Sequence, residues 1–81
     1  MKKNFITIAY NQETQHCESK EFSSIQESAE YFKTLETSAE PNYLPVCTYN
    51  LNTNTILDIS DYYINKDSEL QQIVNSCLSG K

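Results

Sequence analysis

The sequence predicts a single α+β domain of order β-β-α-β-β-α, in which a four-stranded antiparallel sheet carries two helices packed on one face. Two pairs of short segments are each divided by polar turn residues, as in β-hairpins, and three of these four segments are rich in β-branched and aromatic residues. Each pair is followed by a segment whose apolar residues recur every three or four positions, as on one side of an amphipathic helix. Because the 81 residues show no abrupt change in composition, residues 1–81 are expected to form one domain.

The first hairpin is predicted from residues 5–10 (FITIAY), which have the composition of a strand, and from the polar turn segment 11–14. Segment 15–22 is polar and only weakly patterned. As the partner strand it would place Cys17 on one face of the sheet and Phe22 on the other. We therefore expect this segment to be an edge strand.

The first helix is predicted to follow Ser23 or Ser24, because either hydroxyl can cap it, with Gln26 or Glu27 completing a capping box three residues later. Pro41 ends the helix at the latest, since the residue before a proline avoids helical geometry. The apolar stripe of this helix consists of Ile25, Ala29, Phe32 and Leu35.

The second hairpin is predicted from the strand-like run 43–49, the Asn-rich turn 50–54 and the returning strand 55–59. Pro45 has no backbone N–H to donate to a sheet. The strand that contains it should therefore lie at a sheet edge or carry the proline at an early position.

The second helix is predicted to follow a loop at 60–66, with Asp67 or Ser68 as its cap. Gly80 stands where a left-handed C-terminal cap belongs. The apolar stripe of this helix, at positions i, i+3, i+4 and i+7, consists of Leu70, Ile73, Val74 and Cys77.

The net charge and the lengths of the apolar runs argue against two classes of partner, and the cysteines indicate the cellular compartment. The net charge is −5, and the six basic residues are all Lys, so the chain offers few of the contacts that bind phosphate backbones and direct nucleic-acid binding is not expected. No apolar run approaches the roughly 20 residues of a membrane span, so a membrane partner is not expected either. Three cysteines without a CxxC spacing suggest reduced thiols and a cytoplasmic protein.

No segment carries a recognisable catalytic pattern, so neither an enzyme nor a cofactor or metal site is expected. His16 and Cys17 are adjacent, but neighbours on a strand point to opposite faces and cannot easily form a nucleophile–base pair. A zinc site of His16 and the three cysteines would lack the closely spaced ligand pairs of structural zinc. The neighbouring carboxylates are expected to be solvated: Asp58 and Asp61, and Glu27 and Glu30.

The segment Tyr62-Tyr63-Ile64 is best suited to contact another macromolecule, because tyrosine is frequent in interfaces and the two neighbouring tyrosines of a loop cannot both turn inward without cost. The alternative is that one ring packs over the sheet edge and the other is merely exposed. Acidic residues would steer a basic partner toward the chain. The predicted partner-binding residues are Glu27, Glu30, Glu36, Asp58, Asp61, Tyr62 and Tyr63.

These features favour a non-catalytic protein-binding module that acts as a stoichiometric inhibitor or adaptor of a protein with a basic surface. In size, charge and layout the chain resembles small phage and mobile-element anti-defence proteins, anti-CRISPR proteins among them. Such proteins block a larger nucleoprotein machine by occupying its basic, nucleic-acid-binding surface. No sequence motif carries this resemblance. The alternative is a small regulatory protein that homodimerises through an edge strand, at about Pro45 to Tyr49.

Overall fold

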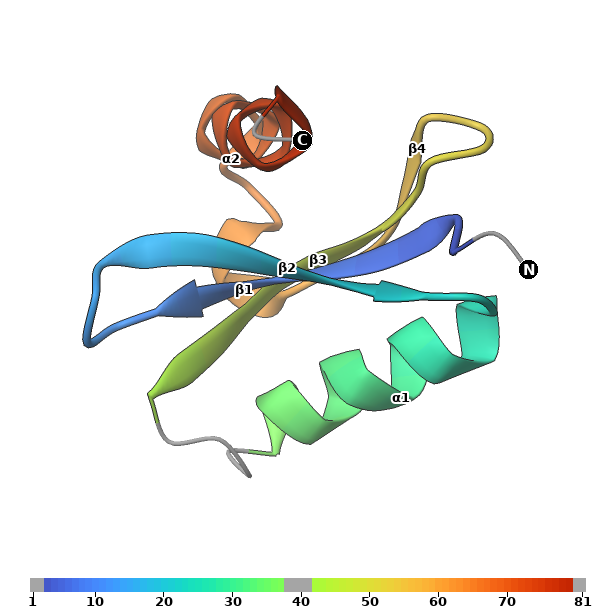
Figure 1. Cartoon of the computed structure of the whole chain (residues 1–81). Coiled ribbons are helices and arrows are strands. Elements are labelled where there is room, and N and C mark those ends of the chain that lie inside the picture. The colour runs from blue at the N-terminus through green and yellow to red at the C-terminus, as the bar shows by residue number, and fades with distance from the viewer. Residues whose placement is uncertain (1–2, 38–41, 80–81) are drawn as a thin grey trace.

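The computed structural model describes residues 3–37 and 42–79, which form one antiparallel sheet of four strands with a helix on each face (Figure 1). The strands are β1 (Phe5–Asn11), β2 (His16–Phe22), β3 (Tyr43–Asn50) and β4 (Thr55–Ile59), in the spatial order β2-β1-β3-β4. The helices are α1 (Ile25–Glu36) and α2 (Asp67–Ser79), and a short 3₁₀ helix, η1 (Asp61–Tyr63), precedes α2. The predicted fold class, element order and antiparallel pairing are confirmed. Pro41 and Gly80, which were expected to bound the helices, lie outside the described residues.

The helices lie on opposite faces of the sheet, whereas the sequence predicted both on one face (Figure 1). The cause lies in β1, whose successive side chains point alternately to the two faces and are buried on both. Thr7 faces α1, and its Oγ1 donates a hydrogen bond of 2.9 Å to the carbonyl oxygen of Ser28. Ile6 and Ile8 face the other way and share a core cluster with Val74 of α2. A strand buried on both sides leaves no sheet face to solvent, so each face receives a helix.

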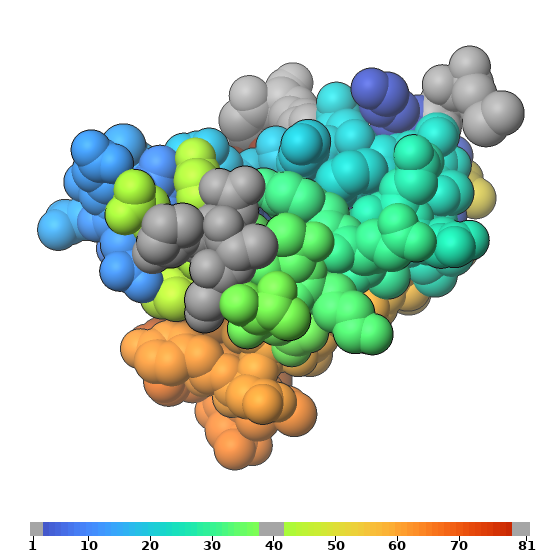
Figure 2. Space-filling model, turned by 90° about the horizontal axis from the view of Figure 1, so that it is seen from below, coloured from blue at the N-terminus to red at the C-terminus, as the bar shows by residue number. Residues whose placement is uncertain are grey.

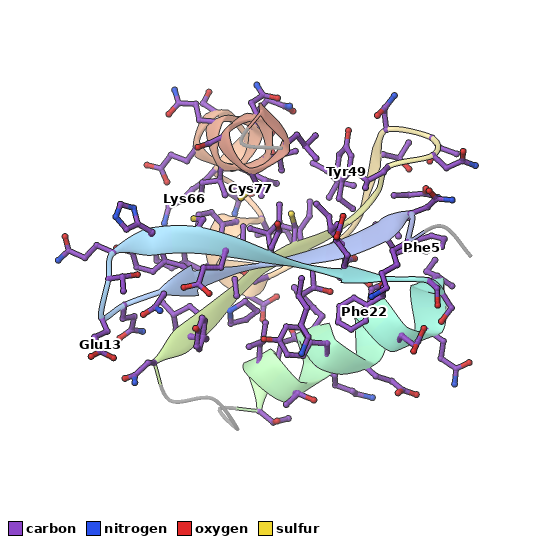
Figure 3. The ribbon with its side chains drawn as sticks, viewed as in Figure 1. Phe5, Glu13, Phe22, Tyr49, Lys66 and Cys77 are labelled. Atoms are coloured by element: carbon purple, nitrogen blue, oxygen red, sulfur yellow. The ribbon has the colours of Figure 1, made fainter. Side chains whose placement is uncertain are left out.

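The layer between α1 and the sheet is built from a few large side chains. Phe32 and Leu35 of α1 are buried against the sheet. Phe22 of β2 extends this layer, because its ring centroid lies 5.6 Å from that of Tyr31, and Figure 3 shows Phe22 on the α1 side. Cys17 instead packs against the core cluster beneath α2. The prediction that Phe22 and Cys17 lie on opposite faces is confirmed.

Helix α1 begins as the sequence predicted, with Ser24 as its N-cap. Ser24 Oγ accepts a hydrogen bond of 3.2 Å from the Glu27 backbone N–H, and the hydroxyls of Ser23 and Ser24 donate to the Glu27 carboxylate. Ile25 was expected to begin the buried stripe but is 52% exposed, because it stands at the first position of the helix.

Helix α2 begins slightly earlier than predicted, since Asp67 and Ser68 both lie inside it. The Leu70 backbone N–H donates to the Lys66 carbonyl at 2.9 Å, so the flanking residue of this helix is Lys66. The predicted stripe is confirmed, with two buried and two half-buried members: Leu70, Val74, Ile73 and Cys77. Within residues 3–37 and 42–79, neither helix is long and apolar enough to cross a membrane.

Strand β3 is an interior strand although it contains Pro45. A β-bulge accommodates the proline: Ile8 pairs with Cys47 and Ala9 with Pro45, which leaves Val46 as an extra residue between them. Pro45 is the third residue of the strand. The sequence allowed two placements of Pro45, in a strand at the sheet edge or early in its strand, and the second is confirmed.

The edges of the sheet are β2, as predicted, and β4. The dimer contact expected at Pro45 to Tyr49 is wrong, because β1 pairs with one side of this segment and β4 with the other from Cys47 onward. In the part of the chain that the structure describes, the strands at the sheet edges are thus β2 and β4.

Both hairpins turn through a residue with a positive φ, Gln15 at 60° and Asn54 at 56°. Asparagine tolerates this left-handed geometry better than most residues, as the sequence predicted for segment 50–54. The side-chain oxygens of Asn11 and Asn50 accept hydrogen bonds from backbone N–H groups of the two turns and hold them closed.

Candidate protein-binding groove

A groove of about 670 Å³ lies on the α2 face of the sheet, beside η1 and α2. Its walls come from the turn end of the first hairpin, the start of β3, η1 and one side of α2. The lining residues are Tyr10, Gln15, His16, Cys17, Leu44, Tyr62, Tyr63, Glu69, Gln72, Ile73 and Ser76. We call this feature the tyrosine groove.

The sheet wall of the tyrosine groove follows from strand pairing. Tyr10 of β1 pairs with Cys17 of β2 on one side and with Leu44 of β3 on the other. Directly paired residues lie on the same face of a sheet, so these three side chains form a continuous surface beneath α2. Leu44 is 43% exposed, which leaves an apolar side chain accessible at the groove.

The two tyrosines of η1 have different environments. Tyr63 is 9% exposed and belongs to the core cluster, whereas Tyr62 is 65% exposed. Their rings meet edge to face, with centroids 4.9 Å apart and planes at 76°. The buried Tyr63 therefore positions the exposed Tyr62. As in the alternative that the sequence allowed, one ring packs and the other is exposed.

The ring of Tyr62 already attracts a cation within the chain. Lys66 Nζ lies 3.6 Å from its centroid, as expected for a cation–π contact. Glu69, in the first turn of α2, contributes a carboxylate to the lining of the same groove. Aromatic faces next to a carboxylate are suited to bind an ammonium or guanidinium group.

The thiol in the groove is held in its neutral form. Burial, and then the nearby Cys77, raise the pKa of Cys17 above its ordinary value of 9.0. Burial also raises the pKa of Cys47, in the core behind it, to about 12, and the other two cysteines add to this effect. A nucleophilic thiol needs a lowered pKa, so the environment of Cys17 is that of a packing residue. Among the described residues, no three His, Cys, Asp or Glu side chains gather to hold a metal ion.

The predicted acidic residues of α1 lie away from the groove, on the opposite face of the sheet. Glu27 takes part in the capping box of the helix. Glu30 accepts a hydrogen bond of 3.3 Å from Gln26 Nε2, and Glu36 is exposed at the last helical position. Figure 2 views the molecule from this side, with α1 in green across the surface.

The two predicted aspartates are also separate from the groove lining. Asp58 Oδ2 accepts a hydrogen bond of 3.3 Å from Thr48 Oγ1, and the Asp58 backbone N–H donates to the same hydroxyl at 3.0 Å. Thr48 pairs with Thr7, which faces α1, so Asp58 lies on the α1 face. Asp61 is exposed at the first position of η1.

Of the predicted contact residues, the structure thus brings only Tyr62 and Tyr63 into the groove. Sequence reasoning missed Tyr10, Leu44 and Glu69, which join them there. For Tyr10 and Leu44 the available signal was an aromatic or apolar residue near a strand end, whereas Glu69, in the first turn of α2, carried none. That the three residues meet depends on the strand order. The chain matches no family model, and no curated protein or solved structure matches it.

Proposed function

We propose that this chain is a small, acidic, non-catalytic protein-binding module that acts in the cytoplasm as a stoichiometric inhibitor of a larger nucleic-acid-binding machine, as anti-CRISPR-like proteins of phages and mobile elements do. The observation that carries the proposal is the exposed ring of Tyr62, fixed by Tyr63 and already in contact with the Lys66 amine. A cationic side chain of a partner would meet the aromatic rings and the Glu69 carboxylate of the same groove. Surfaces that bind nucleic acid are rich in such cationic side chains.

The net charge supports the same class of partner. A chain with a charge of −5 is attracted to a basic surface and repelled by nucleic acid itself. An acidic protein seated on a basic groove excludes the nucleic acid that would otherwise bind there. Inhibition by occupation needs no bond to be made or broken, so it requires no reactive group in the chain.

The proposal is tested by capture of the partner and by its loss of nucleic-acid binding. A tagged chain is used to purify its partner from the native host or its prey, and the partner is then mixed with labelled nucleic acid. We expect one equivalent of the chain to displace the nucleic acid. A partner that keeps its nucleic acid at saturating amounts of the chain would refute inhibition by occupation.

Tyr62→Ala should accelerate dissociation from that partner by roughly tenfold or more, because truncation of an interface tyrosine commonly costs over 1 kcal/mol. Surface plasmon resonance measures this rate. Tyr62→Phe keeps the ring and should retain most of the affinity. Tyr31→Ala, which removes a ring from the α1 face, is the matched control and should leave the rate unchanged. Equal dissociation of the Tyr62→Ala variant and the unaltered chain would exclude the groove as the contact.

A further inference from the structure

The outer side of β2 pairs with no other strand among residues 3–37 and 42–79, and the charges of this strand are self-complementary. β2 has seven residues with Ser19 at its centre. When two copies of such a strand pair antiparallel about Ser19, Glu18 of each copy lies directly opposite Lys20 of the other. Both residues are exposed, and their β1 partners, Ala9 and Thr7, place them on the α1 face.

We propose that two copies of this chain associate through their β2 strands, antiparallel and centred on Ser19, to form one continuous sheet with four strands from each copy. The two reciprocal Glu18–Lys20 pairs lie on one face of that sheet, where opposite charges on directly paired residues stabilise the strand pairing. This proposal does not depend on the inhibitor function, since it uses residues of the sheet edge and of the α1 face.

The charges select one register of the two β2 strands. A shift by two residues in either direction would place Glu18 opposite Glu18 or Lys20 opposite Lys20, and like charges on paired residues destabilise a sheet. A shift by one residue would set side chains of the α1 face against side chains of the α2 face. Pairing centred on Ser19 therefore places opposite charges next to each other, and it also puts the α1 faces of the two copies on the same side of the joint sheet.

The side chains of both charged residues are held on the α1 face within one copy. The Glu18 carboxylate accepts hydrogen bonds from Asn11 Nδ2 at 3.0 Å and from the Tyr43 hydroxyl at 3.2 Å. Lys20 Nζ lies 4.8 Å from the centroid of the Tyr31 ring. These contacts reduce the side-chain freedom that would be lost on association, which favours binding.

The other edge strand lacks this complementarity. β4 is centred on Leu57, so antiparallel self-pairing would place Ile56 opposite Asp58. That arrangement offers no charge pair. The charge pattern thus favours β2 over β4 as the contact between copies.

Sedimentation equilibrium over a range of concentrations, at about 0.15 M salt to screen the net charge, tests the proposal. We expect the unaltered chain to form dimers. Glu18→Lys and Lys20→Glu should each weaken dimerisation by about tenfold or more, because each turns two attractive pairs into two repulsive ones. The double variant Glu18→Lys/Lys20→Glu restores both pairs and should dimerise again.

A mixture of the two single variants gives the sharpest test. The β2 strand of the Glu18→Lys variant carries positive charges at both positions of the pair, and that of the Lys20→Glu variant carries negative charges at both. Each variant is therefore repelled by its own kind and attracted by the other. The mixture should form heterodimers, which a mass tag on one variant identifies. Heterodimer formation also demonstrates that both single variants are folded.

The matched controls are Glu30→Lys and Lys33→Glu, which make the same changes in net charge on α1 and measure the effect of net charge alone, which should be small at this salt concentration. Glu18→Lys also makes the acidic chain less negative, which by itself would favour association, so its loss of dimers would be specific to β2. A monomeric unaltered chain at millimolar concentration would overturn the proposal, as would single variants that dimerise normally or a mixture without heterodimers.

Discussion

Thr7 is a fully buried polar residue in a central strand, and its hydroxyl has a fixed partner. Its Oγ1 donates to the Ser28 carbonyl oxygen at 2.9 Å, which joins β1 to α1. On the neighbouring strands, the buried Thr48 hydroxyl bonds to Asp58. The α1 face of the sheet is therefore held partly by polar contacts, whereas the α2 face carries the larger apolar cluster.

Thr7→Val should lower the free energy of unfolding by about 1–2 kcal/mol, because it keeps the shape of the side chain but leaves the buried Ser28 carbonyl without this donor. Urea denaturation measures the change. Thr34→Val is the matched control, since Thr34 also donates from Oγ1 to a backbone carbonyl, that of Glu30, but on an exposed surface. If both variants lose the same free energy of unfolding, the burial of the Thr7–Ser28 hydrogen bond does not increase its contribution to stability.

Cys47 should make stability fall at alkaline pH. Its pKa rises from the ordinary 9.0 to about 12 in the folded chain, mainly through burial. The thiol is neutral in both states below pH 9, so its contribution to stability is complete there. Between pH 9 and pH 12 only the unfolded state ionises, so the free energy of unfolding falls by up to about 1.4 kcal/mol per pH unit.

Urea denaturation at about pH 8, 9 and 10 under reducing conditions, a range that brackets the ordinary thiol pKa, measures this slope. Cys47→Ala should give a shallower decline, with the remainder due to Cys17 and Tyr63, whose pKa values burial also raises. Parallel declines for the two proteins would show that Cys47 does not ionise on unfolding in this range.

Helix α2 is attached to the sheet by a narrow apolar stripe and forms one wall of the tyrosine groove. Leu70 and Val74 are buried at its centre, and Ile73 and Cys77 are half-buried beside them. Figure 3 shows Cys77 between the helix and the sheet. The geometry of the groove therefore depends on the packing of this one helix.

Leu70→Ala should destabilise the chain by about 2–5 kcal/mol, because it leaves a cavity in the core cluster. Leu44→Ala makes the same change at a 43% exposed position and should cost much less. Thermal or urea unfolding compares the two. Leu44→Ala should instead weaken the proposed partner contact, so a large loss of stability in this variant would argue against Leu44 as an accessible groove residue.

Across the whole molecule, α1 with its acidic residues and α2, which lines the tyrosine groove, lie on opposite faces of one sheet (Figure 1). A flat partner surface cannot contact both at once. The proposed roles of the two surfaces are therefore different: the groove makes the contact, and the acidic residues act through the electrostatic field of the molecule.

Replacing Glu30 and Glu36 by Gln should slow association with a basic partner and reduce its dependence on salt, with little effect on dissociation. Stopped-flow measurements at several ionic strengths give these rates. Lys33→Gln, which removes a positive charge from the same helix, is the control and should have the opposite effect. A faster dissociation of the acid variants would place α1 inside the contact.

Local patterns predicted both α-helices and the four strands of the sheet, because periodicity and capping depend on neighbours in sequence. Ser24 and Glu27 marked the start of α1, and the spacing of Leu70, Val74 and Cys77 marked the buried side of α2. Asn54 marked a turn with positive φ. The adjacent tyrosines of η1 were predicted as partner contacts by the same kind of local reasoning, but which of the two rings is buried was not predicted.

The amino-acid sequence by itself determined the order of the elements, the antiparallel hairpins and the acidic net charge, since these follow from residue types and short spacings. The tertiary structure decided that β1 and β3 are central, that the helices lie on opposite faces, and that Tyr10, Leu44 and Glu69 meet Tyr62. The physical reason is that these features depend on which strands pair across long stretches of chain. A run such as Ile6 to Ala9 is compatible with one buried face or two until its neighbours are in place.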